Sequence, residues 1–112
     1  MSQLLRAAFV FVILAMLWVT VVASQDRSVL QAAQEIWADP WGKATLFDTY
    51  FAFFTVWLWM AYREPTWTRR LLWLLGVIFL GNFVIAAYFL IALGHPGKDD
   101  DWTKIFRPVE TL

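Results

Sequence analysis

The chain of 112 residues contains no cysteine and only one histidine, His95. Without cysteine there are no disulfides, thiolate nucleophiles or thiolate metal sites, and His95 has no second histidine with which to share a metal ion. Charged residues are scarce, at 16%, and the net charge is zero. A neutral chain has no basic field to attract nucleic acid. We therefore expect no metal, no other cofactor and no nucleic-acid partner.

Catalytic constellations are missing as well. The sequence offers no Ser-His-Asp or Cys-His set, no pair of neighbouring carboxylates in an apolar run, and no glycine-rich phosphate loop. These absences argue against a hydrolase or a kinase, and they favour a protein that is not an enzyme.

Hydrophobic residues are abundant, at 61%, and gather in three runs at 4–23, 44–62 and 71–93. A helix crosses the ~30 Å hydrocarbon layer in about 20 residues. We therefore expect an all-α membrane protein, with three transmembrane helices in one membrane domain of residues 1–112 and a polar C-terminal tail at 94–112. A signal peptide cleaved after Ala23 is the alternative for the first run, whose length favours a retained helix.

A short helix is expected between the first two runs, at about 28–38. Ser28 and Gln31 have the form of a capping box. Leu30, Ala33 and Trp37 share one helical face, and the Asp39-Pro40 pair ends the segment. The pattern predicts an interfacial amphipathic helix lying on the membrane surface. A solvated connector is the alternative.

Aromatic and basic residues predict how the helices sit in the bilayer. Trp and Tyr prefer the two membrane interfaces. Five aromatic anchors are expected near the hairpin of residues 63–70, namely Trp57, Trp59, Tyr62, Trp67 and Trp73. Four are expected toward the opposite surface, namely Trp37, Trp41, Tyr50 and Tyr88.

Positive charge in short loops marks the cytoplasmic side. The hairpin carries Arg63, Arg69 and Arg70, and the N-terminal segment adds Arg6, whereas the surface segment has Arg27 and Lys43. This distribution predicts a multi-pass protein of the bacterial inner membrane with the N-terminus and the hairpin in the cytoplasm. With three spans the C-terminus lies outside, although Lys98, Lys104 and Arg107 of the tail count against that side.

Among the polar residues inside the apolar runs, Asp48, Thr55 and Asn82 are candidates for a specific role. Thr45, Asp48, Ala52 and Thr55 share one helical face, which we expect to turn toward the other helices. Asp48 is a first-turn acid of a helix that begins at Thr45, a buried functional acid, or a purely structural polar contact. We interpret Asn82 as a contact between helices.

One stretch resembles a known family. The residues are Trp41 to Phe51 with the Thr-Leu-x-Asp-x-Tyr pattern of Thr45 to Tyr50, then Trp57, Tyr62-Arg63-Glu64, Leu80-Gly81-Asn82 and Ala86-Ala87-Tyr88. From Trp41 to Leu93 the chain is similar to short bacterial integral membrane proteins that contain a domain of unknown function. The resemblance implies a three-helix membrane protein and brings no activity with it.

Three functional hypotheses follow. The first is a non-enzymatic accessory subunit or oligomerising helix bundle in the lipid bilayer, forming a homo-oligomer or part of a larger membrane complex, because three short helices bury little surface alone. The second is a subunit acting on or binding an apolar lipid such as a carotenoid, with Asp48 as proton donor; it rests on an analogy of architecture with the small subunits of heterodimeric carotenoid cyclases. The third is a small transporter component, for which more than one intramembrane charge is expected.

Overall fold

The computed structural model describes residues 1–94 and 101–109. Residues 95–100 and 110–112 of the predicted polar tail, including His95 and Lys98, lie outside the described residues. The described part of the chain contains helices and no strand, which confirms the all-α prediction. The α-helices are α1 (Ser2–Asp26), α2 (Val29–Ala38), α3 (Pro40–Arg63), α4 (Trp67–Leu80) and α5 (Asn82–Leu93), followed by the 3₁₀ helix η1 (Trp102–Phe106).

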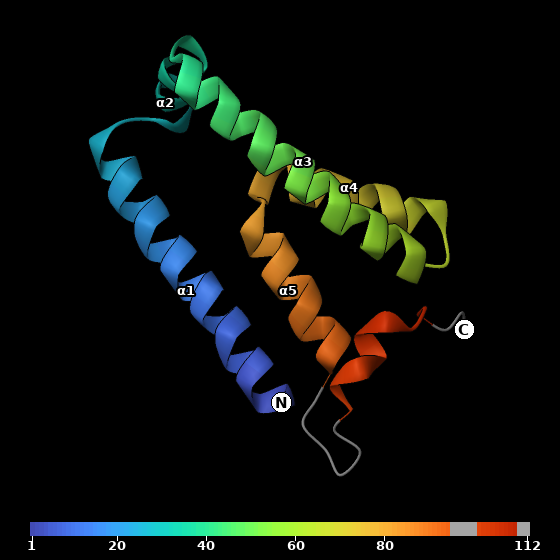
Figure 1. Ribbon diagram of the computed structural model, residues 1–112. Helices are drawn as coiled ribbons and strands as arrows, with labels where there is room; N and C mark the ends of the chain where they lie inside the picture. The colour runs from blue at the N-terminus through green and yellow to red at the C-terminus, as the bar shows by residue number, and fades with distance from the viewer. Residues whose placement is uncertain (95–100, 110–112) are drawn as a thin grey trace.

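The first two predicted runs form α1 and α3, which extend beyond them at both ends. Within the described residues, these two helices are long and apolar enough to cross a membrane. They run in opposite directions along the length of the molecule (Figure 1). α3 begins at Pro40, where the ring fixes a helical φ and the missing N–H has no partner to lose.

The predicted short helix is present as α2. The side chain of Ser28 accepts a hydrogen bond from the Gln31 amide at 3.2 Å, as a capping residue does. The Gln31 side chain donates to Glu35 rather than back to Ser28, so only half of the predicted capping box forms. The Asp39-Pro40 pair ends α2 and starts α3.

The prediction of one continuous helix over 71–93 is wrong. The helix breaks at Gly81, whose φ of 53° and ψ of −122° place it outside the helical region. A side chain at this position would strain the backbone, and a Cβ would lie 2.9 Å from the Phe53 ring. A hydropathy run gives no sign of a break, because the residues on both sides of Gly81 remain apolar.

The break folds the chain back on itself. α4 lies beside α3, and α5 turns away to lie beside α1 (Figure 1). Since the tip of this bend touches Phe53, near the middle of Pro40–Arg63, it reaches about half the height of α3. α4 and α5 are about 21 Å and about 18 Å long at 1.5 Å per residue, so each is shorter than a hydrocarbon layer of ~30 Å.

Two clusters form the core, both in the half of the molecule near the α3–α4 hairpin. The first contains Met60, Val77, Ile85 and Tyr88 from α3, α4 and α5. The second joins Ala92 and Leu93 of α5 to Ile105 of η1, with Leu5 and Phe9 of α1 packed against it. The Phe9 and Phe89 rings stack at 4.3 Å between centroids. α5 therefore connects α1 to the other helices.

Candidate functional site at the hairpin end

The most polar buried region lies where α3 turns into α4. Arg63 and Glu64 are both buried there, with 8% and 2% of their surface exposed. The Arg63 guanidinium lies over the rings of Trp59 and Tyr88, at 5.6 and 5.3 Å from their centroids. Such cation–π contacts stabilise a partly desolvated cation. Tyr88 is 2% exposed, and its hydroxyl has no hydrogen-bond partner among the described residues.

Glu64 holds the hairpin closed. Its Oε2 lies 3.3 Å from Nη2 of Arg69, while its backbone carbonyl accepts a hydrogen bond from Nε of Arg70 at 3.0 Å. Oε2 accepts no hydrogen bond, so the contact with Arg69 is electrostatic. The Trp57 indole N–H donates to the carbonyl of Arg70 at 2.8 Å and ties α3 to α4. Glu64 thus links the end of α3 to the first turn of α4 through Arg69 and Arg70.

The C-terminal segment covers this region, which corrects the prediction that the tail lies at the end opposite the hairpin. The Val109 amide donates to the Arg63 carbonyl at 2.7 Å, and Nε of Arg63 donates to the Arg107 carbonyl at 3.1 Å. The Trp59 indole donates to the Ile105 carbonyl at 3.1 Å. The fold-back at Gly81 is the cause, because it returns α5 and everything after it to the hairpin end.

The start of α1 reaches the same place. Nη2 of Arg6 donates to the carbonyls of Leu93 and Gly94, at 3.1 and 3.2 Å. The N-terminal segment, the hairpin and the described tail therefore share one end of the molecule (Figure 1). We call it the hairpin end.

Asp101 organises the first turn of η1. Its Oδ1 accepts hydrogen bonds from the hydroxyl and the amide of Thr103, and its Oδ2 pairs with Arg107 at 2.7 Å. The hydrogen bonds from Thr103 hold the pKa of the Asp101 carboxyl below its ordinary value, and the charge of Arg107 adds to this.

Asp48 lies away from the hairpin end. Because α3 begins at Pro40, Asp48 belongs to its third turn, and a first-turn capping role is excluded. The hydroxyl of Thr45 donates to the carbonyl of Trp41 instead of capping a helix. The face expected to turn inward is exposed, with Thr45, Asp48, Ala52 and Thr55 all uncovered. The carboxylate of Asp48 makes no hydrogen bond or ion pair with a described residue.

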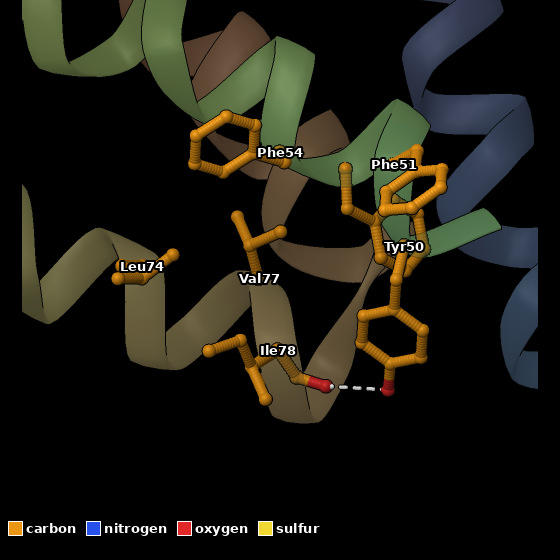
Figure 2. A pocket seen from close by; sticks show the side chains of 7 residues that line it. Tyr50, Phe51, Phe54, Leu74, Val77 and Ile78 are labelled. Carbon is orange, nitrogen blue, oxygen red and sulfur yellow. Dashed lines mark hydrogen bonds between the residues drawn. The ribbon is translucent and has the colours of Figure 1, made fainter. Parts of the chain in front are cut away.

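Asn82 lies at the tip of the bend, as the first residue of α5. It is exposed, and its side chain has no hydrogen-bond partner within the described ranges. On the other side of Gly81, the Tyr50 hydroxyl donates to the Ile78 carbonyl at 3.0 Å (Figure 2). This carbonyl lies in the last turn of α4, where the break removes its helical partner. Tyr50 thus caps the broken end.

The predicted aromatic anchors fall into two groups. Trp37, Trp41, Tyr62 and Trp67 are exposed. Trp59 and Trp73 are partly buried, and both contact the Tyr88 ring edge-on, at 5.2 and 4.8 Å between centroids. Tyr88, expected near the opposite surface, lies at the hairpin end with them.

An apolar groove separates α3 from α4 on the side of the bend. It has a volume of about 450 Å³, and Figure 2 shows Phe54, Leu74 and Val77 on its walls. Asp48 is not among the residues that line it. This groove therefore does not include the proposed proton donor.

The sequence does not predict the buried cluster of Arg63, Glu64 and Tyr88. Its patterns indicate a role in topology for Arg63, no role for Glu64, and a position at the opposite end for Tyr88. The adjacency of Arg63 and Glu64 in a loop with two further arginines was the available signal, since charges of opposite sign in a tight turn often pair.

The described residues hold no group of three or more His, Cys, Asp or Glu side chains suited to a metal ion. No curated protein and no solved structure matches the chain. A family of proteins of unknown function, DUF1475, matches residues 2–106. Because the match covers nearly all of the sequence, the chain belongs to the DUF1475 family.

Proposed function

We propose that this protein is a non-enzymatic integral membrane protein that assembles with further copies of itself. α1 and α3 cross the bilayer, α2 lies on one surface, and α4 and α5 form a hairpin that enters and leaves the bilayer from the other surface. The exposed apolar side chains of the two long helices support this arrangement, among them Phe11, Leu14 and Trp18 of α1 and Phe51 and Leu58 of α3. Lipid is the natural neighbour of such surfaces.

The charges support a single orientation. Among the described residues, the hairpin end carries six cationic side chains, and the α2 end carries two, Arg27 and Lys43. The six are Arg6, Arg63, Arg69, Arg70, Lys104 and Arg107. Lys and Arg in short segments resist translocation. We therefore place the N-terminal segment, the hairpin and the tail in the cytoplasm, and α2 on the outer surface.

The observation that carries the assembly is the bend at Gly81. Its tip lies at half the height of α3, which is the middle of the bilayer if α3 spans it. A break there leaves backbone groups without helical partners, and irregular backbone at this depth needs protein or water around it. The tip instead presents Asn82 beside Phe79 and Leu80, which are 80% and 57% exposed.

A second copy of the chain fits this surface. An asparagine amide carries both donors and an acceptor, so two Asn82 side chains related by a two-fold axis satisfy each other. Hydrogen bonds of this kind contribute about 1–2 kcal/mol to helix association in model membranes. Phe79 and Leu80 then supply the apolar rim of the contact.

The test is the size of the particle in a mild detergent. The wild-type chain is expected to be a dimer or larger, and Asn82→Leu to weaken its association about tenfold, the equivalent of 1.4 kcal/mol. Thr20→Val is the matched control, because Thr20 is also an exposed polar residue of an apolar helix. The control is expected to leave the association unchanged.

Two results contradict the proposal. A wild-type chain that is monomeric at every detergent concentration, or an Asn82→Leu variant that associates as strongly as wild type, removes the support for self-assembly at the tip. Release of the chain from membranes by alkaline carbonate contradicts the membrane embedding itself.

A further inference from the structure

A second groove lies on the face formed by α4 and α5. It has a volume of about 380 Å³ and is lined by Arg69, Leu72, Trp73, Gly76 and Val84. A Cβ at Gly76 would lie only 3.2 Å from Cγ1 of Val84, so the glycine keeps the floor of the groove open. The groove therefore combines a long apolar wall with one cationic end.

Arg69 has hydrogen-bonding capacity to spare. Its side chain is 49% exposed, and among the described residues its contact is the single 3.3 Å approach to Oε2 of Glu64. A guanidinium carries five N–H donors in a planar fork. No described residue accepts a hydrogen bond from this side chain, and Arg69 is one of the residues that line the groove, so an oxyanion bound there can accept its donors.

The level of Arg69 in the membrane is set by its neighbours. Trp67, two residues earlier at the start of α4, is 66% exposed, and the guanidinium of Arg70 lies 4.9 Å from the centre of its ring. An exposed tryptophan with a cation over its face belongs at the headgroup level. From Arg69, the groove runs along α4 for about 10 Å to Gly76, at 1.5 Å per residue.

The charge of the groove selects an anion. Arg69 is the one charged side chain among the described residues that line it, and Glu64 faces Arg69 from a buried position with 2% of its surface exposed. Basic pockets between membrane helices on the cytoplasmic side bind anionic lipid headgroups. A charge-assisted pair between Arg and phosphate can be bidentate, which a surface lysine does not offer.

We propose that this groove binds an anionic phospholipid, with the phosphate on Arg69 and an acyl chain along Leu72, Gly76 and Val84. A lipid is favoured over a soluble phosphate because the wall beyond Arg69 is apolar and would otherwise remain uncovered. The inference rests on the membrane embedding proposed above and is independent of self-assembly at Asn82.

The experiment measures lipid retention by the full-length chain. Protein purified in detergent is mixed with equal amounts of phosphatidylglycerol and phosphatidylcholine, and the bound lipids are counted by native mass spectrometry. Wild type is expected to retain phosphatidylglycerol preferentially, and Arg69→Gln to reduce that preference about fivefold to tenfold, the effect of one interfacial cation. Arg27→Gln is the matched control at the other end, where Arg27 pairs with Asp26 and Glu35, and it is expected to leave the preference unchanged.

Three outcomes overturn the proposal. The first is an unchanged preference in Arg69→Gln, and the second is an equal loss in Arg27→Gln. The third is displacement of the lipid by inorganic phosphate at millimolar concentration, which identifies a soluble anion as the ligand.

A second variant, Arg69→Lys, serves if Arg69→Gln fails to fold. It keeps the charge but loses the planar fork of donors, and we expect it to retain part of the preference. Full retention contradicts bidentate binding. A variant that loses the preference for phosphatidylglycerol but still reconstitutes into vesicles does not contradict the proposed membrane embedding.

Discussion

The two carboxylates of α3 and its hairpin have opposite surroundings. Glu64 is buried against Arg69, whereas Asp48 is exposed on the third turn of α3 without a described partner. The same chemical change therefore has different consequences at the two positions. A buried charge that loses its pairing leaves the opposite charge uncompensated, and an exposed one leaves nothing behind.

We expect Asp48→Asn to change the free energy of unfolding by less than about 0.5 kcal/mol, as surface substitutions usually do. Glu64→Gln, the matched change at the buried position, is expected to cost about 1–3 kcal/mol because it leaves Arg69 without its counter-charge. Half of the Arg69 side chain is exposed, which keeps the cost below that of a fully buried pair. Thermal unfolding in detergent compares the two variants. Equal effects would show that Asp48 has a contact that the single chain does not contain.

Asp101 makes the tail sensitive to acid. Because the folded state holds the pKa of Asp101 below its ordinary value of 3.8, ionisation stabilises the cap of η1. This contribution is complete above pH 3.8 and is lost as the pH falls through the lower pKa of the folded state. We expect hydrogen exchange at the Thr103 amide, corrected for the intrinsic rate, to accelerate below that pH. In Asp101→Asn the exchange is expected to be fast already at pH 6 and to show no step.

At the scale of the helices, local signals predicted what local interactions decide. Ser28 caps the first turn of α2, and Pro40 fixes a helical φ at the first residue of α3. The two long apolar runs became α1 and α3. The break at Gly81 was not predictable in this way, because a single glycine inside an apolar helix is common and costs only about 1 kcal/mol there. Contacts from distant residues, Phe53 and Tyr50, accompany the break.

The candidate site shows the same division. The sequence identified the arginines of the hairpin, but the contacts of Arg63 with Tyr88 and Arg107 depend on the direction of α5. Because the sequence does not predict the bend at Gly81, it predicts the wrong end of the molecule for Tyr88. Helix content can be predicted from periodicity, whereas the partners of a buried arginine require the tertiary fold.

Tyr50→Phe tests the cap at the broken end of α4. The substitution removes the hydroxyl that donates to the Ile78 carbonyl and leaves the ring in place. We expect a loss of about 1 kcal/mol in the free energy of unfolding, together with faster hydrogen exchange in the last turn of α4. Tyr62→Phe is the control, since the Tyr62 hydroxyl has no partner in the described part of the chain. An equal response of the two variants would mean that the hydroxyl of Tyr50 does not stabilise the bend.

For the whole molecule, the fold-back decides which segments share a side of the membrane. The chain has no cysteine, so single cysteines report their own positions. We expect Thr68→Cys in the hairpin and Pro108→Cys in the tail to be protected from a membrane-impermeant thiol reagent in intact cells, and Gln34→Cys on α2 to react. All three positions are exposed to solvent or lipid, so burial does not explain a difference. Labelling of both Pro108→Cys and Gln34→Cys would contradict the fold-back and support three transmembrane helices.

We expect a single residue, Gly81, to set this topology. The bend requires φ of 53° and ψ of −122° at Gly81 and a close approach to Phe53, where a Cβ would lie 2.9 Å from the ring. A leucine there incurs about 1–3 kcal/mol of backbone strain in the bend. In a straight helix the same leucine gains about 0.8 kcal/mol over glycine. A continuous helix from Trp67 to Leu93 is about 40 Å long and therefore long enough to cross the bilayer.

The contacts that return the tail to the hairpin end oppose a straight helix. They are chiefly the hydrogen bonds of Trp59 and Arg63 to η1 and the residues after it. Each contributes about 1 kcal/mol, so the strain is large enough to compete with them. We expect Gly81→Leu to make Pro108→Cys reactive in intact cells while Thr68→Cys stays protected. Gly76→Ala is the control, because it crowds Val84 without a positive φ, and its labelling pattern should be that of the parent. A Gly81→Leu chain whose tail remains protected would show that packing of α5 against α1, rather than the glycine, holds the fold-back in place.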